Sequence, residues 1–379
     1  MAVRENSSRR DKVFALGELF SGPGGIGIGA LRASATDDKG KIFRVEHAWA
    51  NDYDSSSCES YRSYLPIEDE MVFCENVKDF VSRFKDIPPI QALTFGFPCN
   101  DFSMVGETKG LDGEFGPLYE FGAKAIDFFK PDWFLAENVG GMTHANEGRA
   151  FPRILNRLRR AGGGYEIVPH LYRFEDYGIP QRRHRIVIVG IRSDHRLAFR
   201  VPAPTHTQDD LVTSRHALER HPNVDSLPNS ERTRQSPRVV RRLEKIRPGE
   251  NAWTADLPEE LQLNVKGARL SNIYRRLDPD RPSYTVTGSG GGGTHMYHYA
   301  EPRALTNRER ARLQSFPDDF EFKGSKEAVR KQIGMAVPPL ASEIIITAIL
   351  KTFAGVPYES MQQKWSQEQL EAMISDADE

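Results

Sequence analysis

The sequence predicts an α/β protein built around a largely parallel sheet. In the first half of the chain, short β-branched or aromatic runs alternate with longer helical patterns, which is typical of βαβ units. A glycine-rich turn follows the first run directly, and residues able to do chemistry follow later runs. The chain has 379 residues, enough for two or three domains of about 100 to 200 residues each.

Six strands are expected in the first half. They are short β-branched or aromatic apolar runs, and they cover residues 13–20, 43–51, 71–74, 90–97, 133–136 and 185–190. Beyond residue 193, prolines, isolated charges and few apolar periods predict loops and short strands as far as residue 281. We therefore expect a first domain over residues 1–192 and a second over 193–325.

Helical patterns return near the C-terminus, at residues 307–314 and 341–353. The second pattern is amphipathic and could pack back on the first domain, so residues 326–379 are assigned to a returning C-terminal part. The last segment, 355–379, has six acidic residues and one lysine. It is expected to be a solvated helix or a fraying end.

Composition excludes several classes of protein. With 51 Lys and Arg against 53 Asp and Glu, the net charge is −2, so any polyanion binding has to be local. The longest apolar stretches, such as 344–350, fall short of the roughly 20 residues of a membrane span. The N-terminus, 1–12, has no apolar signal core, and no two cysteines have CxxC spacing. We expect a reducing, cytosolic protein without structural zinc or disulfides.

The glycine turn has the spacing of a nucleotide-binding loop. Gly22, Gly24 and Gly27 stand in a GxGxxG pattern between a strand and a helix, where missing side chains let a ligand approach the backbone. Asp52 follows the second strand and could bind ribose hydroxyls, with Tyr53 beside it to stack on a ring. A tight strand-to-helix turn explains the glycines alone about as well. The pattern suits any nucleoside cofactor and does not separate a nicotinamide dinucleotide from S-adenosylmethionine.

Two further strands end in reactive side chains. Strand 90–97 leads into Pro98-Cys99, and strand 133–136 leads into Glu137-Asn138. Carboxyl ends of parallel strands share one edge of a sheet, so these residues should converge with the glycine turn. A thiolate, a carboxyl able to donate a proton and a nucleoside cofactor together suggest covalent attack on an electrophilic ring. The other cysteines, Cys58 and Cys74, are expected to be buried small hydrophobic residues.

Five ordered motifs carry a resemblance to a known family. They are Phe20-Ser21-Gly22-Pro23-Gly24-Gly25, Pro98-Cys99, Glu137-Asn138-Val139, Gln181-Arg182-Arg183-His184-Arg185 and Gly334-Met335-Ala336-Val337-Pro338-Pro339. In this order they resemble the motifs of DNA cytosine-5 methyltransferases of the bacterial restriction-modification type. The resemblance covers most of residues 16–350 except 193–281. It implies a Rossmann-like, S-adenosylmethionine-dependent methyltransferase sheet, with a smaller, mostly β or irregular target recognition domain.

The resemblance implies a catalytic role for five residues. The thiolate of Cys99 would add to carbon 6 of cytosine, making carbon 5 nucleophilic toward the methyl group of S-adenosylmethionine. A carboxyl at Glu137 would hold or donate a proton at ring nitrogen 3, and Asn138 would help to fix that geometry. Arg183 and Arg185 would bind the base carbonyl or an adjacent phosphate.

The resemblance also implies a set of cofactor contacts. Asp52 would bind the ribose hydroxyls, Tyr53 would cover the adenine face, and Asn76 would accept from the adenine amine. The complete set is Phe20, Gly22, Pro23, Gly25, Asp52, Tyr53, Asn76, Val77, Pro98, Leu118, Met335 and Val337. Met335 departs from the asparagine usual at its position, so a polar contact to the amino-acid end of the cofactor is expected to be missing. The product would be S-adenosyl-L-homocysteine, and no metal is implied.

Several segments are expected to contact DNA. Chemistry at carbon 5 requires the cytosine to leave the helix, and segment 100–116 fits a loop that closes on it. Asn100, where glutamine is common in the family, would fill the gap left by the base, and Ser103 would touch the backbone. Arg275 and Arg276 are the candidates for guanine contacts.

A basic stretch supplies the local positive charge that DNA binding requires. Residues 228–247 carry seven Lys and Arg against two Glu, a net of +5. A solvated charged helix face would also explain this composition.

The leading hypothesis is a DNA cytosine-5 methyltransferase that protects host DNA from a cognate restriction endonuclease. It would act as a monomer on double-stranded DNA in the bacterial cytoplasm, at the nucleoid, without a membrane. A close alternative is the same chemistry on tRNA, although the long segment between the arginine motif and residue 274 favours duplex DNA. An inactive DNA-binding regulator and a dehydrogenase are further alternatives, but they leave Cys99, Glu137 and Arg185 unexplained.

Overall fold

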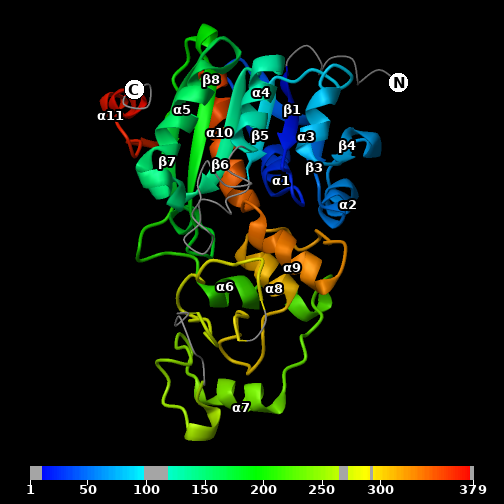
Figure 1. Cartoon of the computed structure of the whole chain (residues 1–379), viewed down its shortest axis with the longest axis vertical. Helices are drawn as coiled ribbons and strands as arrows, with labels where there is room; N and C mark the ends of the chain where they lie inside the picture. Colours follow the sequence, from blue (N-terminus) through cyan, green and yellow to red (C-terminus); the bar gives the residue numbers. More distant parts are fainter. Residues whose placement is uncertain (1–10, 98–117, 264–271, 291–292, 376–379) are drawn as a thin grey trace. The chain divides into compact units, whose positions relative to one another are not determined.

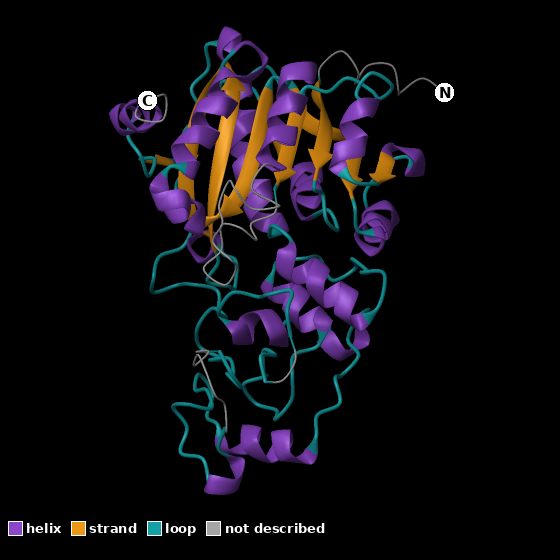
Figure 2. Ribbon diagram, viewed as in Figure 1, coloured by secondary structure: helices purple, strands orange, loops and turns teal. Residues whose placement is uncertain are grey.

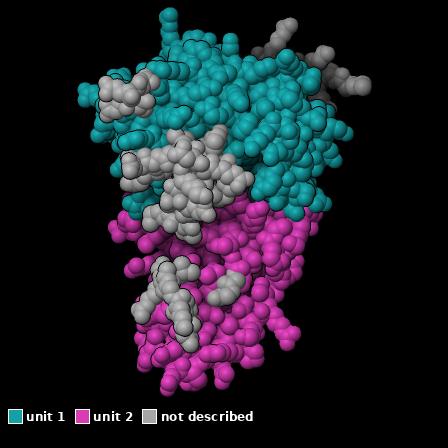
Figure 3. Space-filling view, in the orientation of Figure 1, with its two compact units in different colours: residues 1–173, 184–204, 341–379 teal, residues 174–183, 205–340 magenta. Residues whose placement is uncertain are grey.

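The computed structural model describes residues 11–97, 118–263, 272–290 and 293–375. The chain divides into two compact units, coloured separately in Figure 3. Unit 1 comprises residues 1–173, 184–204 and 341–379, and unit 2 comprises 174–183 and 205–340. These boundaries differ from the domain boundaries expected at 192/193 and 325/326. The functional division into catalytic and recognition domains remains a proposal.

Unit 1 is organised around one mixed sheet, whose strands are orange in Figure 2. Its strands are β1 (Lys12–Leu19), β2 (Ser34–Thr36), β3 (Ile42–Asp52), β4 (Val72–Cys74), β5 (Ala92–Gly96), β6 (Trp133–Val139), β7 (Tyr165–Arg173) and β8 (His184–Arg192). The spatial order is β2-β3-β1-β5-β6-β8-β7, and β4 pairs with β3. Pairing is parallel from β4 through β3, β1 and β5 to β6, and antiparallel at β2, β8 and β7. The predicted α/β fold is confirmed.

Helices cover both faces of this sheet. They are α1 (Gly25–Arg32), α2 (Ser55–Tyr64), α3 (Val77–Phe80), α4 (Tyr119–Phe129), α5 (Ala150–Arg160), α10 (Pro339–Ala354) and α11 (Gln367–Ser375), and α10 begins in unit 2. Figure 1 shows α4 and α5 in front of the sheet and α10 behind it. An aromatic cluster fills the front layer, where the buried Trp49 ring contacts Phe80, Phe84 and Phe129. Gly17 permits this packing, because a Cβ at that position would clash with Cζ2 of the Trp49 ring.

The C-terminal segment forms a helix, one of the two forms expected, but one face of it is packed rather than solvated. Leu370 and Ile374 of α11 are buried in the same core as Phe151 of α5. The ring of Trp365, just before α11, lies 4.9 Å from the Phe151 ring. A short pair of strands, β9 (Val201–Pro202) and β10 (Ser360–Met361), anchors the same segment. Apolar residues spaced four apart on α11 supply the burial, because they share one helix face.

One helical run near the C-terminus is strongly apolar. Lys326–Ala354 is long and apolar enough, by length and composition, to cross a membrane. However, 72% of its most apolar window is buried inside the protein. A core helix passes the same test, so the run does not argue for a membrane span.

Unit 2 has helices and irregular segments. Its helices are α6 (Ser214–Glu219), α7 (Pro237–Lys245), α8 (Asn307–Leu313) and α9 (Lys326–Met335). Among its described residues, β structure is limited to isolated bridges such as Arg276 with Tyr297, rather than the short strands expected. A small apolar core forms around Leu243, Ile246 and the stacked rings of Tyr274 and Tyr297. Side chains such as Arg276 also tie the long connections of this unit together by donating to backbone carbonyls.

Candidate active site

The ends of β5 and β6 meet where the sequence places its reactive residues. Gly96 of β5 lies opposite Glu137 of β6. The Nδ2 of Asn138 donates to the Phe97 carbonyl at 3.2 Å, and its Oδ1 accepts from the Val139 N–H at 2.7 Å. Asn138 therefore ties the two strand ends together, immediately before the segment that carries the predicted nucleophile. The next residues, Pro98, Cys99, Asn100 and Ser103 among them, lie outside the described residues, and their roles stay predictions.

Glu137 is held by an arginine from the neighbouring strand. The Nε of Arg185 lies 2.9 Å from Oε1 of Glu137, and the two side chains are 14% and 11% exposed. The antiparallel register of β6 and β8 brings them together, since Arg185 pairs with Val139, two residues beyond Glu137. A Cβ at Gly96 would lie 3.4 Å from Oε2 of Glu137, so the glycine keeps this side open. A nearly buried carboxyl with a fixed orientation is suited to hydrogen bonding with a ring nitrogen.

Arg183 has a different role from the one expected. It is buried and donates to the carbonyls of Val286, Gly334 and Ala336 at 3.0 to 3.2 Å. These bonds, all within unit 2, join two segments distant in sequence. They make Arg183 a positioning residue, and we remove it from the proposed contacts with the base. Arg185 remains the arginine beside the carboxyl.

The glycine turn adopts a left-handed conformation at three positions. Phe20, Gly22 and Gly24 have φ values of 54°, 55° and 95°. A Cβ at Gly24 would lie 2.7 Å from Leu65 Cδ1, whereas nothing lies within 4 Å of a Cβ at Gly22. Gly24 is thus required by packing, and Gly22 leaves open space beside the turn. Helix α1 then begins at Gly25 with no side-chain cap, so its first N–H groups can receive a polar ligand.

Asp52 couples the turn to the end of β3. Its Oδ2 accepts from the Gly22 N–H at 2.8 Å, and its Oδ1 accepts from the Asp54 N–H at 2.9 Å. Burial raises the pKa of Asp52, and the two backbone N–H donors act against that rise. Tyr53 follows with 62% of its surface exposed. The hydroxyl of Ser21, in the turn itself, is buried and has no partner among the described residues.

These features fit a nucleoside cofactor with a polar end. The glycine turn offers open backbone, Ser21 offers an unused hydroxyl, and Asp52 and Tyr53 offer a carboxylate and an exposed ring. Pro23 belongs to the same turn, and Gly25 is the first residue of α1.

The remaining predicted cofactor residues lie at element ends. The Oδ1 of Asn76 accepts from the Lys78 N–H at 2.9 Å and caps α3, so the oxygen expected to meet the adenine amine already accepts one bond. Val77 and Leu118 are buried apolar residues of unit 1. In unit 2, Val337 is buried, and Met335, at the end of α9, is 56% exposed. Cofactor contacts at all these positions stay predictions.

Sequence reasoning missed a buried carboxyl beneath the turn. Glu18 of β1 is fully buried, its Oε2 accepts from Thr94 Oγ1 at 3.0 Å, and its Oε1 has no partner among the described residues. Burial raises the pKa of Glu18 to about 8. The signal was present in the sequence, because a carboxylate in the apolar run 13–20 is unusual. Glu18 is therefore mainly a protonated carboxylic acid at neutral pH, packed between β1 and β5.

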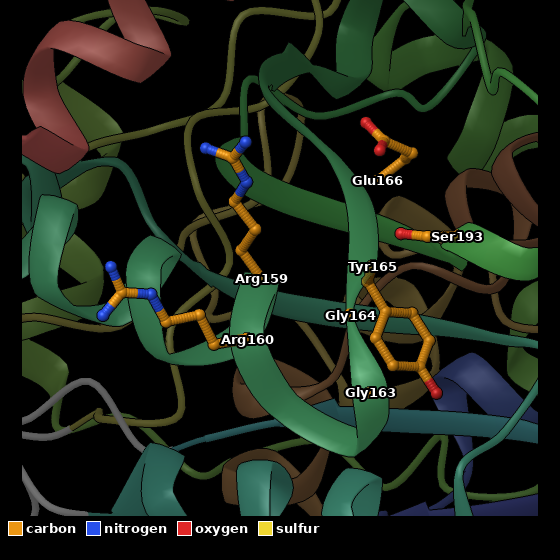
Figure 4. Close-up of a pocket in the computed structure, with 7 residues that line it drawn as sticks. All are labelled: Arg159, Arg160, Gly163, Gly164, Tyr165, Glu166 and Ser193. Atoms are coloured by element: carbon orange, nitrogen blue, oxygen red, sulfur yellow. The ribbon is translucent and has the colours of Figure 1, made fainter.

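A surface hollow of unit 1 lies away from these residues. It has a volume of about 520 Å³, and Figure 4 shows its lining: Arg159, Arg160, Gly163, Gly164, Tyr165, Glu166 and Ser193. Tyr165 begins β7 and pairs with Arg192, beside the pairing of Trp133 with Ile191. This is the start of β6, the edge opposite to Glu137. The hollow therefore belongs to a different edge of the sheet from the candidate site.

The two cysteines in the described part of the chain differ in burial. Cys58 is buried as expected, but Cys74 is exposed, which corrects that expectation. Among the described residues, no cluster of three or more His, Cys, Asp and Glu side chains could hold a metal ion.

The two candidate guanine-binding arginines differ. Arg276 is buried and donates to the carbonyls of Leu243, Ile246, His298 and Tyr299. This guanidinium holds unit 2 together, and we remove Arg276 from the proposed DNA contacts. The guanidinium of Arg275 lies 4.9 Å from the centre of the Tyr284 ring, and Arg275 remains a candidate.

The basic stretch presents part of its charge to solvent. Arg242 of α7 is buried and donates to the Leu261 carbonyl, and Arg232 pairs with Asp225 and Glu301. The exposed cations are the paired Arg232 and also Arg234, Arg238, Arg241, Lys245 and Arg247. Three of them recur at helical spacing along α7, which makes one basic face.

The chain is similar to known DNA methyltransferases in sequence and in fold. The model of the C-5 cytosine-specific DNA methylase family matches residues 14–351. The chain is 57% identical to the Type II methyltransferase M.BbvI of Brevibacillus brevis, over 95% of this chain and 96% of that protein. It is 39% identical to M.NgoFVII of Neisseria gonorrhoeae, over 92% and 89%. A solved E. coli structure, described as a prophage-encoded DNA modification methyltransferase, shares the fold with a TM-score of 0.68 and 24% identity, over 89% of this chain and 99% of that one. The chain therefore belongs to the C-5 cytosine-specific DNA methylase family.

Proposed function

We propose that this cytosine-5 DNA methylase modifies one specific sequence in double-stranded DNA, using S-adenosylmethionine as the methyl donor. The observation that carries the proposal is the pairing of Glu137 with Arg185 beside the strand end that leads to Cys99. Relatives named Type II methyltransferases, aligned over nearly the whole chain, support duplex DNA as the substrate. The tRNA, regulator and dehydrogenase alternatives are not favoured by these relatives.

The proposed cofactor site is formed by residues at the carboxyl ends of β1 and β3. When bound, S-adenosylmethionine supplies an electrophilic methyl group. We propose that the glycine turn and the N-terminus of α1 hold its polar end, that Asp52 binds the ribose hydroxyls, and that Tyr53 covers the adenine. Because Asp52 also accepts from the Gly22 N–H, ribose binding and the shape of the turn are coupled.

In the proposed mechanism, the Cys99 thiolate forms a bond to carbon 6 of a flipped-out cytosine. Negative charge then develops over the ring, and Glu137 stabilises it by holding or donating a proton at nitrogen 3. Arg185 keeps that carboxyl oriented, and Asn138 keeps the ends of β5 and β6 at a fixed separation. Carbon 5 takes the methyl group, a base removes the carbon 5 proton, and elimination of the thiolate restores the aromatic ring.

The biological setting is a further part of the proposal. We propose that the protein acts as a monomer on DNA in the bacterial cytoplasm and protects sites recognised by a cognate restriction endonuclease. Two relatives carrying Type II names support this setting. The endonuclease is proposed as a functional partner, with no physical complex implied.

Bisulfite sequencing of duplex DNA treated with the protein tests the proposal. The expected result is protected cytosines at one recurring sequence, and activity confined to tRNA would contradict it. Trapping provides a second test. Duplex DNA containing 5-fluorocytosine is expected to form a covalent adduct with the wild type and none with Cys99→Ser.

A further inference from the structure

Helix α8 of unit 2 buries three arginines, and two of them show how this fold satisfies a buried guanidinium. Arg308 donates to the carbonyls of Pro228, Pro317 and Phe320. Arg312 donates to the carbonyls of Leu218, Arg220 and Pro222, and to the carboxylate of Asp318. Each charge is thus surrounded by oxygen acceptors, which is what burial of a cation requires.

The third arginine, Arg310, lacks such acceptors. It is 1% exposed, and none of its three guanidinium nitrogens has a hydrogen-bond partner among the described residues. The adjacent Glu309 does not serve it, because both of its carboxylate oxygens accept from Arg303 at 2.8 Å and one also accepts from the Thr306 N–H. A purely structural arginine would be expected to make bonds like those of Arg308 and Arg312.

A second cation lies near Arg310, and the carboxylate that attracts it, Glu309, is already paired with Arg303. Arg330 of α9 interacts unfavourably with Arg310, and its own Nε is buried without a partner among the described residues. Burial raises the pKa of Tyr284, and the charges of Arg310 and Arg275 both act against that rise. His295 faces Arg310 and Arg330, and burial, followed by these two charges, lowers its pKa to about 4. The exposed Glu327 acts in the opposite direction and raises the pKa of His295.

The excess of positive charge around Arg310 indicates the class of ligand. A buried cation without acceptors is strongly destabilising, so a site that retains several cations requires an anion or another function for them. The edge of a guanine base would supply acceptors but no negative charge. A phosphodiester supplies both, and guanidinium groups bind it bidentately.

We propose that Arg310, together with Arg275 and Arg330, forms a binding site for a backbone phosphodiester of the DNA substrate. The inference rests on the proposed function, since it takes the substrate to be duplex DNA. It adds a residue that no sequence pattern singled out. Gly290 lies over the site, because a Cβ there would approach Arg330 Nε to 3.0 Å and His295 Nδ1 to 3.1 Å. Because Arg310 is 1% exposed, residues around it have to move for a phosphate to reach it.

The test uses Arg310→Met in the full-length protein, because methionine keeps an apolar stem of similar length without the charge. We expect its affinity for duplex DNA to fall about tenfold or more, and the slope of log K against log salt to become shallower by about one. The thermal unfolding midpoint without DNA is expected to stay the same or to rise. Arg310→Lys, which keeps the charge, should retain the wild-type salt slope and part of the affinity.

Two control variants separate charge from structure. Arg281→Met removes a cation whose side chain is 68% exposed and should change DNA affinity by no more than about twofold. Arg312→Met removes a fully bonded guanidinium and should lower the unfolding midpoint, in contrast to Arg310→Met.

Three outcomes would overturn the inference. The first is that Arg310→Met lowers the unfolding midpoint and leaves DNA affinity and salt slope at wild-type values, which would make Arg310 structural. The second is that inorganic phosphate raises the midpoint of the wild type but not of Arg310→Met, while both bind DNA equally; the site would then take a free anion. The third is that Arg310→Lys behaves as Arg310→Met in the salt slope. Methylation of duplex DNA by the wild type is scored separately, so the proposed function can fail or stand independently.

Discussion

Glu137 and Arg185 form an ion pair across two antiparallel strands, with 2.9 Å between Arg185 Nε and Glu137 Oε1. The pair sits where β6 ends, next to the strand end that Asn138 ties to Phe97. Two arginines close in sequence therefore have different partners. Arg185 meets a carboxylate of the candidate active site, whereas Arg183 donates to backbone carbonyls of unit 2.

The first prediction concerns this pair. Glu137→Gln keeps the size of the side chain but cannot donate a carboxylic proton, so the single-turnover rate of methyl transfer should fall about 100-fold or more. Arg185→Met should lower the same rate by a smaller factor. Because it also leaves the Glu137 carboxyl misplaced, it should lower the yield of the 5-fluorocytosine adduct. Glu166→Gln, an exposed carboxylate at the opposite edge of the sheet, is the control and should retain the wild-type rate. Equal rates for Glu137→Gln and the control would remove Glu137 from the mechanism.

The second prediction concerns Asp52. In Asp52→Asn one of the two backbone N–H groups, of Gly22 or Asp54, loses its acceptor, and the cofactor ribose loses a charged one. The affinity for S-adenosylmethionine should fall about 10- to 100-fold by titration calorimetry, with DNA affinity unchanged. The matched control is Asp37→Asn, because Asp37 also accepts from two backbone N–H groups in a turn, those of Lys39 and Lys41. An Asp52 variant that binds the cofactor as tightly as the control would contradict the assignment.

The third prediction concerns the pH dependence of stability. The pKa of Glu18 is about 8 in the folded protein and 4.5 as its ordinary value. Between these values the folded chain keeps a proton that the unfolded chain has released, so Glu18 lowers stability as pH rises, by about 1.4 kcal/mol per pH unit. Glu18→Gln keeps an acceptor for Thr94 and has no proton to lose. The free energy of unfolding of Glu18→Gln, measured in urea, should therefore increase relative to that of the wild type between pH 5 and pH 8. Parallel plots of the two free energies against pH would refute this.

The fourth prediction separates two adjacent arginines. Arg276→Met leaves four buried carbonyls without their donor and should destabilise the protein by about 3 to 5 kcal/mol. Arg275→Met loses a contact with the Tyr284 ring and should cost about 1 kcal/mol, but it should weaken DNA binding. Denaturation and DNA titration of both variants decide the matter. The assignment fails if Arg276→Met changes sequence preference without changing stability.

The fifth prediction concerns the basic face of α7. The double variant Arg241→Gln with Lys245→Gln removes two exposed cations, so the slope of log K against log salt should become shallower by about two. The preferred DNA sequence should not change, because phosphate contacts do not read bases. Arg232→Gln is the comparison, since Arg232 is already paired with Asp225 and Glu301 and should change the slope less. An unchanged slope in the double variant would place α7 away from the DNA.

Local pattern explains which parts of the fold were predictable. The strands β1, β5 and β8 each contain a run of mostly apolar residues, and β3 mixes apolar and polar residues before an apolar stretch near its end. Such local patterns need no distant partner to be recognised. Strand β7 was missed because it is an edge strand with Pro169 in its middle, and β structure at an edge tolerates proline. Helix α11 was expected to be solvated, because its acidic composition hides the two residues, Leu370 and Ile374, that its packing against α5 buries.

By itself, the sequence determined the α/β class, the order of the motifs and the positions of Glu137, Asp52 and the glycine turn at strand ends, because these follow from local spacing. Tertiary structure alone decided what each arginine does. Arg183 and Arg276 meet backbone carbonyls, Arg185 meets a carboxylate, and Arg310 meets neither. A guanidinium has the same chemistry at every position, and only chain segments distant in sequence determine which acceptors surround it.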